Sequence, residues 1–146
     1  MFEKLFLLVK NNAGKAVMEH QEIAVKDRDA VINEASSSII EVLKGQMESG
    51  KLKELVKYFQ HPEIYQNSLT NTVVNKFANK LNRFYNIEPV AALRIANSLM
   101  PPVMLDLIKQ TKIEENKEFA LSSFLSKING NRADLTTLVN QIIMTS

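Results

Sequence analysis

The sequence predicts an all-α protein that folds as a compact multihelical bundle of about seven short to medium helices. Apolar side chains recur at the three- and four-residue spacing of an amphipathic helix along most of the chain. Helix-ending residues separate these periodic stretches, and the short connections favour antiparallel neighbours in a bundle. No stretch combines strict alternation of apolar and polar residues with hairpin turn chemistry, so a β-sheet is not expected.

The N-terminal ten residues predict a short amphipathic helix that covers the core. Its apolar side chains lie at helical spacing and are Phe2, Leu5, Phe6 and Val9. The helix is expected to end near Asn11, and the weak periodicity of residues 15 to 26 predicts a loop or a loose turn. The apolar run at residues 5 to 9 is too short for a signal peptide, and no cleavage pattern of small residues follows it.

Two further helices are predicted before residue 62. Asp27 or Asp29 can accept backbone N–H groups as the cap of a long helix that runs to about Glu48. Gly50 tolerates the left-handed conformation that ends such a helix. A shorter helix follows and is expected to end at His61, because the residue before a proline is driven out of the helical conformation. Its apolar side is formed by Leu52, Leu55, Val56 and Phe59.

A central helix is predicted over residues 69 to 85, with Ser68 as its cap. Its apolar positions cover about half of the circumference, which is more than one neighbouring helix needs. Asn86 can adopt the left-handed conformation that ends this helix. Pro89 suits the first turn of the next helix, which carries small alanines on its buried side.

The C-terminal part of the chain predicts further helices. Pro101-Pro102 is expected to break or kink the helix that begins at Pro89, after which helical spacing resumes. Residues 111 to 118 form a charged connection. The next helix is expected to close at Asn129-Gly130, and its apolar side chains are Phe119, Leu121, Phe124, Leu125 and Ile128. The last helix has Asp134 as its cap, and its apolar side is Leu135, Leu138, Val139 and Ile142.

The composition indicates a single globular domain of residues 1 to 146. The apolar fraction is 45%, the charged fraction is 23%, and only four Gly and four Pro occur, which excludes the disordered and fibrous classes. Within this domain we distinguish an N-terminal helix and loop at 1–26, a helical core at 27–110 and C-terminal helices at 111–146. No stretch approaches the roughly eighteen consecutive apolar residues of a membrane span, so no integral membrane association is expected.

The chain contains no cysteine, which excludes disulfides, thiolate zinc sites and cysteine nucleophiles. This composition suits a reducing compartment, and we expect a cytoplasmic protein. The formal net charge of +2 is too small to make nucleic acid an expected partner, since dedicated nucleic-acid binders carry a strongly basic face.

No residues form a recognisable catalytic or metal-binding arrangement. His20 and His61 are isolated from other metal-binding side chains in the sequence. Ser36, Ser37 and Ser38 lie within a predicted helix rather than on a strained turn, which favours a helix contact over a nucleophile. Gly-rich phosphate-binding motifs are absent. We therefore expect no enzymatic activity, no metal and no cofactor.

Residues 39 to 59 and 81 to 108 carry a pattern of helix breaks, small residues and leucines. Its members are Gly45, Gly50, Leu52, Leu55, Phe59, Leu81, Ile87, Ala91, Ala92, Ala96, Leu99, Pro101 and Leu105. With this pattern the chain resembles the YidB-like family of small bacterial helical proteins, a domain of unknown function. The family often has glycine where this sequence has Asn86. The resemblance implies a multihelical fold, no established activity and no catalytic residues.

The predicted central helix has a polar face rich in asparagine and basic residues. Its members are Asn75, Lys76, Asn79, Lys80, Asn82 and Arg83, and Asn71 and Asn86 extend the asparagine row at both ends. Amides can pair with base edges or sugar hydroxyls while cations hold phosphates, which makes this face a hypothetical recognition surface. The aromatic side chains needed to stack unpaired bases lie on the apolar side instead. A solvated helix face is therefore the favoured interpretation.

We expect a non-enzymatic helical protein that acts as a protein-interaction or structural module. Many large apolar side chains are available for contacts with a protein partner or with a second copy of the chain. The alternative is nucleic-acid binding through the Asn/Lys/Arg face of the helix at residues 69 to 85. A third possibility is an enzyme whose catalytic groups converge from distant helices, which one sequence does not reveal.

Overall fold

The computed structural model describes residues 3–14, 17, 20–21, 23–113, 120–129 and 136–145. These residues form seven α-helices and one short 3-10 helix and contain no strand, which confirms the all-α prediction. The predicted positions of Phe2, Phe119, Gly130, Asp134 and Leu135, and most of the predicted charged connection at 111 to 118, lie outside the described residues.

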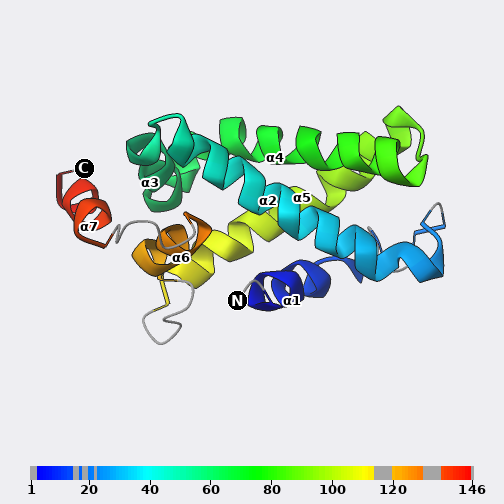
Figure 1. The fold of residues 1–146 in the computed structure, drawn as a ribbon, viewed down its shortest axis with the longest axis horizontal. Coiled ribbons are helices and arrows are strands. Elements are labelled where there is room, and N and C mark those ends of the chain that lie inside the picture. The colour runs from blue at the N-terminus through cyan, green and yellow to red at the C-terminus, as the bar shows by residue number, and fades with distance from the viewer. Residues whose placement is uncertain are drawn as a thin grey trace. The chain divides into compact units, whose positions relative to one another are not determined.

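The chain divides into two compact units. Unit 1 consists of Met1–Ile39 and Thr70–Leu105, and unit 2 consists of Ile40–Leu69 and Asp106–Ser146. Three long helices contribute residues to both units: α2 (Arg28–Glu48), α4 (Pro62–Tyr85) and α5 (Pro89–Thr111). Figure 1 shows the chain reversing direction between α4 and α5.

Unit 1 begins with α1 (Glu3–Asn11), close to the predicted helix. Its core comes from α1 and from parts of α2, α4 and α5, and its largest fully buried side chains include Leu5, Ile32, Ile39, Phe77, Leu81, Ile95, Leu99, Met100 and Met104. The segment after α1 also supplies Ala13, Val17 and Ile23 to this core, although its weak periodicity predicted only a loop or a loose turn. Ala13 and Val17 are four residues apart, and the Val17 N–H donates to the Ala13 carbonyl at 2.9 Å, but Ile23 lies six residues further on, so the three residues do not form a continuous helical pattern.

The start of α2 is tied to α1 by charge. A 3-10 helix, Val25–Asp27, leads directly into α2. The Lys10 ammonium lies 3.4 Å from an Asp29 carboxylate oxygen and 6.0 Å from the centre of the Phe6 ring. Asp29 therefore pairs with the end of α1 from the first turn of α2, where a negative charge also favours the helix dipole.

The end of α2 follows the prediction at Gly50. Its φ is 75°, the Gly50 N–H donates to the Met47 carbonyl at 3.1 Å, and the Lys51 N–H donates to the Gln46 carbonyl at 2.9 Å. These two bonds satisfy carbonyls that the helix end would otherwise leave unpaired. The next helix, α3, spans Leu52–Gln60 and ends at His61 as predicted.

The predicted start of the central helix at residue 69 was wrong. Helix α4 begins at Pro62, so Ser68 lies inside the helix and is not its cap. Proline has no N–H, and the first helical position needs none, so Pro62 ends α3 and begins α4 with no residue between His61 and the new helix. The sequence prediction used only the helix-ending role of this proline.

The turn after α4 was predicted correctly at Asn86, whose φ is 53°. Of the predicted break or kink at Pro101-Pro102, the break does not occur, because α5 continues through both prolines to Thr111. The apolar face that Leu99, Met100 and Val103 bury on both sides of the prolines continues without interruption. Core packing along this face offsets the loss of two backbone hydrogen bonds.

Unit 2 contains α3, α6 (Leu121–Ile128), α7 (Thr136–Thr145) and the remaining parts of the long helices. Helix α7 packs against α3 and α6. The apolar side chains predicted for α3 are mostly buried, and Tyr58 is buried beside Phe59 with its ring edge-on at a centroid distance of 5.4 Å. On α7, Val139 is buried as predicted, but Leu138 is exposed.

Helix α5 is long and apolar enough, by length and composition, to cross a membrane. Its most apolar window has a mean hydropathy of 1.2, and 56% of that window is buried inside the protein. The sequence prediction concerned unbroken apolar runs, and single polar residues interrupt the apolar runs of this helix. A mostly buried core helix has the same length and composition.

Candidate functional site

Three asparagines of the predicted polar face line a groove in unit 1, between α4 and α5. We call it the asparagine groove. Its volume is about 290 Å³, and its lining residues are Asn75, Ala78, Asn79, Asn82, Pro89 and Leu93. The asparagines come from successive turns of α4, whereas Pro89 and Leu93 come from the first turns of α5. One wall therefore carries amide groups and the other carries apolar side chains.

The backbone turn between α4 and α5 sets the width of this groove. The Ile87 N–H donates to the Leu81 carbonyl at 3.3 Å, and the Asn82 side-chain amide donates to the Ile87 carbonyl at 2.9 Å. Ile87 is only 4% exposed and anchors the turn in the core. Asn82 thus has a structural role, and part of its hydrogen-bonding capacity is already used.

Lys80 does not belong to the groove. Its ammonium lies 3.5 Å from a Glu34 carboxylate oxygen of α2, and its side chain is only 13% exposed. Residue 80 lies about 100° around the helix from residue 79, which directs it toward α2 instead of α5. The Coulomb attraction at this partly buried position holds Lys80 against Glu34, so its charge is largely neutralised locally.

The structure therefore divides the six predicted face residues. Asn75, Asn79 and Asn82 line the groove, and Lys80 is paired with α2. Lys76 and Arg83 are exposed on α4, about 60° and 40° around the helix axis from Asn79. Sequence spacing identified the common side of α4, but it could not identify Pro89 and Leu93 as the opposite wall.

The phenol of Tyr85 lies at the C-terminal end of α4, next to the turn that leads to α5. Tyr85 is half-buried, and its pKa is raised above the ordinary value of 10.0, first by burial and then by the negative charges of Glu34 and Asp27. Burial and nearby carboxylates both disfavour the phenolate. The Lys80–Glu34 ion pair thus joins α4 to α2, and the charge of the same carboxylate contributes to the raised pKa of Tyr85.

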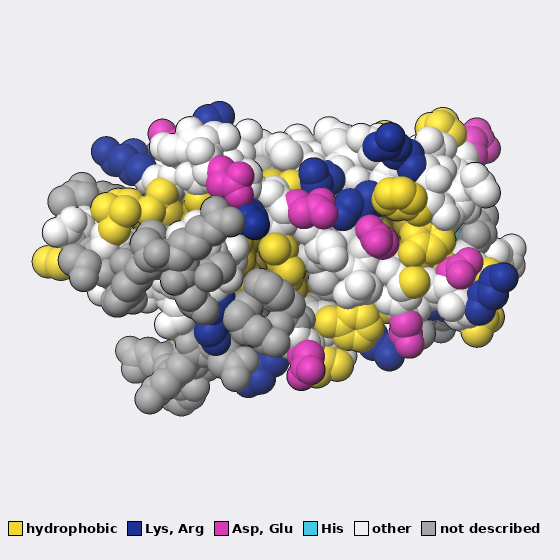
Figure 2. Space-filling model, viewed as in Figure 1, with side chains coloured by type: hydrophobic (Ala, Val, Ile, Leu, Met, Phe, Trp, Pro, Cys, Tyr) yellow, Lys and Arg dark blue, Asp and Glu magenta, His cyan; other side chains and the backbone are white. Residues whose placement is uncertain are grey.

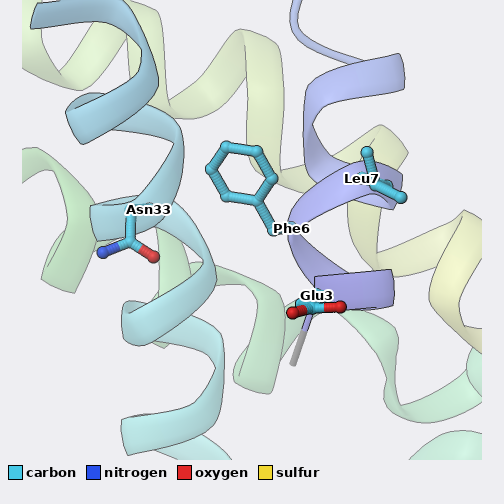
Figure 3. Close-up of a pocket in the computed structure, with 4 residues that line it drawn as sticks. All are labelled: Glu3, Phe6, Leu7 and Asn33. Carbon is cyan, nitrogen blue, oxygen red and sulfur yellow. The ribbon is translucent and has the colours of Figure 1, made fainter. Parts of the chain in front are cut away.

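A second pocket in unit 1 lies between α1 and α2. Its volume is about 490 Å³, and it is lined by Glu3, Phe6, Leu7 and Asn33. Figure 3 shows the Phe6 ring pointing from α1 toward α2, with Asn33 on the opposite helix. The described residues that line it include one carboxylate and one amide, and no nucleophile with a neighbouring general base is among them. We regard this pocket as a packing depression beside a short helix.

Several large apolar side chains are exposed in unit 1. On α5, Val90 is 61% exposed and Leu93 is 42% exposed, and on α4 Phe84 is 64% exposed. Phe84 lies about 180° around α4 from Asn75, so this aromatic ring is remote from the groove. The face drawn in Figure 2 carries several separate groups of hydrophobic side chains with Lys, Arg, Asp and Glu side chains between them.

Two of the serines considered as nucleophiles have ordinary structural positions in α2. The Ser36 hydroxyl donates to the Ile32 carbonyl at 3.1 Å, and the Ser38 hydroxyl donates to the Glu34 carbonyl at 2.8 Å. Both serines are buried in α2, as a helix contact requires. Among the described residues, no three His, Asp or Glu side chains are grouped as a metal ion would need.

Comparisons with known proteins give no further assignment. No protein-family model matches this chain, and no curated protein or solved structure matches it either.

Proposed function

We propose that this chain is a non-enzymatic helical module that binds a protein partner through the asparagine groove. The observation that supports this proposal is the mixed lining of the groove, with amides on α4 facing the exposed Leu93 and Pro89 of α5. Protein interfaces combine an apolar centre with hydrogen-bonding groups around it. A groove that places both on rigid helices is suited to such contacts.

The size of the groove also favours a contact surface over an enclosed ligand site. Small-molecule sites usually have volumes of about 300–1,000 Å³ and bury most of the ligand. The asparagine groove, at about 290 Å³, lies just below that range. It can accept one anchoring side chain and leaves the rest of a partner on the surrounding helices.

Affinity capture with a matched pair of variants tests this function. Leu93→Asp places a charge in the groove, whereas Met144→Asp makes the same change at a side chain of unit 2 that is 87% exposed. We expect a captured protein to be lost with Leu93→Asp and retained with Met144→Asp. An identical set of captured proteins for both variants and the parent chain would reject the groove as the interface. Light scattering of the purified chain identifies self-association as the alternative protein contact.

Nucleic-acid binding is the second candidate, supported by the exposed Lys76 and Arg83 beside the amides. It is the weaker candidate because Lys80 is paired with Glu34 and Asn82 is bonded to the Ile87 carbonyl. A salt series with a labelled oligonucleotide tests it. Replacing Lys76 and Arg83 by Ala should flatten the salt dependence if phosphates bind there.

The resemblance to the YidB-like family and a cytoplasmic location are further parts of this proposal. The first is supported by the residue pattern around Gly50 and Pro101, and the second by the absence of cysteine. Most of the residues that carry the resemblance end helices or pack in the core.

A further inference from the structure

The charges around the asparagine groove are mainly positive. The part of unit 1 from Thr70 to Leu105 contains four basic residues and one acidic residue. The acidic residue is Glu88, and the basic residues are Lys76, Lys80, Arg83 and Arg94. Of these residues, Lys80 is paired with Glu34, whereas Arg83 and Arg94 are exposed, as is the single carboxylate, Glu88. Electrostatic complementarity therefore favours an anionic occupant.

These cations stand on the outer sides of both groove helices. On α4, Lys76 and Arg83 flank the asparagines on the side turned away from α5. On α5, Arg94 follows Leu93 and is about 100° around the helix from it. An occupant of the groove would thus have positive charge on either side, with an apolar and amide floor between.

The residues that line the groove distinguish between a nucleic acid and an acidic peptide, the two anionic classes of macromolecule that could bind there. Unpaired bases bind proteins by stacking on aromatic rings, and none of the described residues that line the groove is aromatic. Leu93 and Pro89 instead offer an apolar contact, which a phosphate backbone cannot use. The amides of Asn75 and Asn79 both donate and accept hydrogen bonds, as a polypeptide backbone requires. The groove therefore fits a peptide better than a nucleic acid.

We propose that the asparagine groove binds an acidic peptide segment of a partner protein, with one aliphatic side chain anchored against Leu93 and Pro89. The carboxylates of this segment lie toward Arg83 and Arg94, and its backbone pairs with Asn75 and Asn79. This inference rests on the proposed function, because it names the kind of protein segment that the groove accepts.

Selection from a random twelve-residue peptide library displayed on phage, with the full-length chain immobilised, tests the proposal. We expect the enriched peptides to combine several Asp or Glu residues with one Leu, Ile or Val. A labelled peptide from this set should bind about threefold to tenfold more weakly to Arg83→Glu/Arg94→Glu than to the parent chain. The matched control is Lys53→Glu, which reverses an exposed charge on α3 in unit 2.

The outcomes separate this inference from the proposed function. Peptides that are not acidic, bind independently of Arg83 and Arg94, and are lost with Leu93→Asp would overturn the inference and leave the proposed function in place. Binding unaffected by Leu93→Asp, or no enrichment at all, would overturn the inference and count against the groove. Tighter binding of a labelled twenty-residue oligo-dT than of any selected peptide would also overturn it. Circular dichroism of each variant verifies that the helices are intact.

Discussion

The turns that follow α2 and α4 have the same left-handed backbone conformation in different surroundings. Both place a residue in the left-handed region, Gly50 at a φ of 75° and Asn86 at a φ of 53°. The turn at Gly50 is exposed, and nothing lies within 4 Å of a Cβ added there. The turn at Asn86 is followed by the buried Ile87 and is held by the Asn82 side chain. The first turn only ends a helix, whereas the second also shapes the asparagine groove.

The largest expected effect is at the buried anchor of the second turn. Ile87→Ala removes three carbon atoms from a side chain in the core and should lower the free energy of unfolding by about 2–5 kcal/mol. Urea denaturation followed by circular dichroism measures this loss. Peptide binding should weaken as well, since the turn sets the groove width. A loss below about 0.5 kcal/mol would mean that the turn is not anchored through Ile87.

The first turn should respond to backbone conformation alone. Gly50→Ala should lower the free energy of unfolding by about 1–2 kcal/mol, although the site has room for the methyl group, because the left-handed conformation strains an alanine. Gly50→Asn should recover part of this loss. The matched control is Gly45→Ala within α2, which should stabilise the chain by about 0.5–1 kcal/mol. Equal effects of the two alanine substitutions would contradict the role of φ at Gly50.

The side-chain bond across the second turn should have a smaller effect. Asn82→Ala removes the hydrogen bond to the Ile87 carbonyl and should cost about 0.5–1.5 kcal/mol. Asn79→Ala, one turn earlier on the same groove wall, should leave stability within about 0.5 kcal/mol of the parent chain. Thermal and urea unfolding of both variants separate a turn residue from a groove residue. Matching losses would show that Asn82 has no special part in the turn.

The smallest effect is expected at alkaline pH, at the residue that precedes Asn86. The raised pKa of Tyr85 means that the unfolded chain loses the phenolic proton before the folded chain does. The stability linked to this group is therefore complete below about pH 10 and falls as the pH rises through the folded pKa. Tyr85→Phe should remove this part of the alkaline loss. If the free energies of unfolding of the parent chain and the variant change in parallel from about pH 8 to pH 11, the linkage is contradicted.

The helix ends and the core helices could be predicted from sequence because their signals are local. Gly50 and Asn86 stand where a helical pattern stops, and both adopt the expected conformation. Pro62 was misread because one proline both ends a helix and starts the next. Pro101 was misread because tertiary packing decides whether a helix continues through a proline.

The candidate site could be predicted only in part. Spacing along one helix grouped Asn75 with Asn79, but it could not assign Lys80 to Glu34, which lies far away in the sequence. Leu93 carried no polar signal and was therefore missed as a groove residue. Ile87 belongs to no long periodic stretch, so its burial became visible only in the folded turn.

The prolines inside α5 determine what can cover the exposed side of this helix. Since Pro101 and Pro102 have no N–H, the carbonyl oxygens of Asn97 and Ser98 lack the amide donors that a helix normally provides four residues later. Both of these residues are exposed on unit 1. Any surface that covers this stretch must bring its own hydrogen-bond donors or retain water there, because an unsatisfied buried carbonyl costs about 1–3 kcal/mol. A purely apolar partner surface would therefore not cover Asn97 and Ser98.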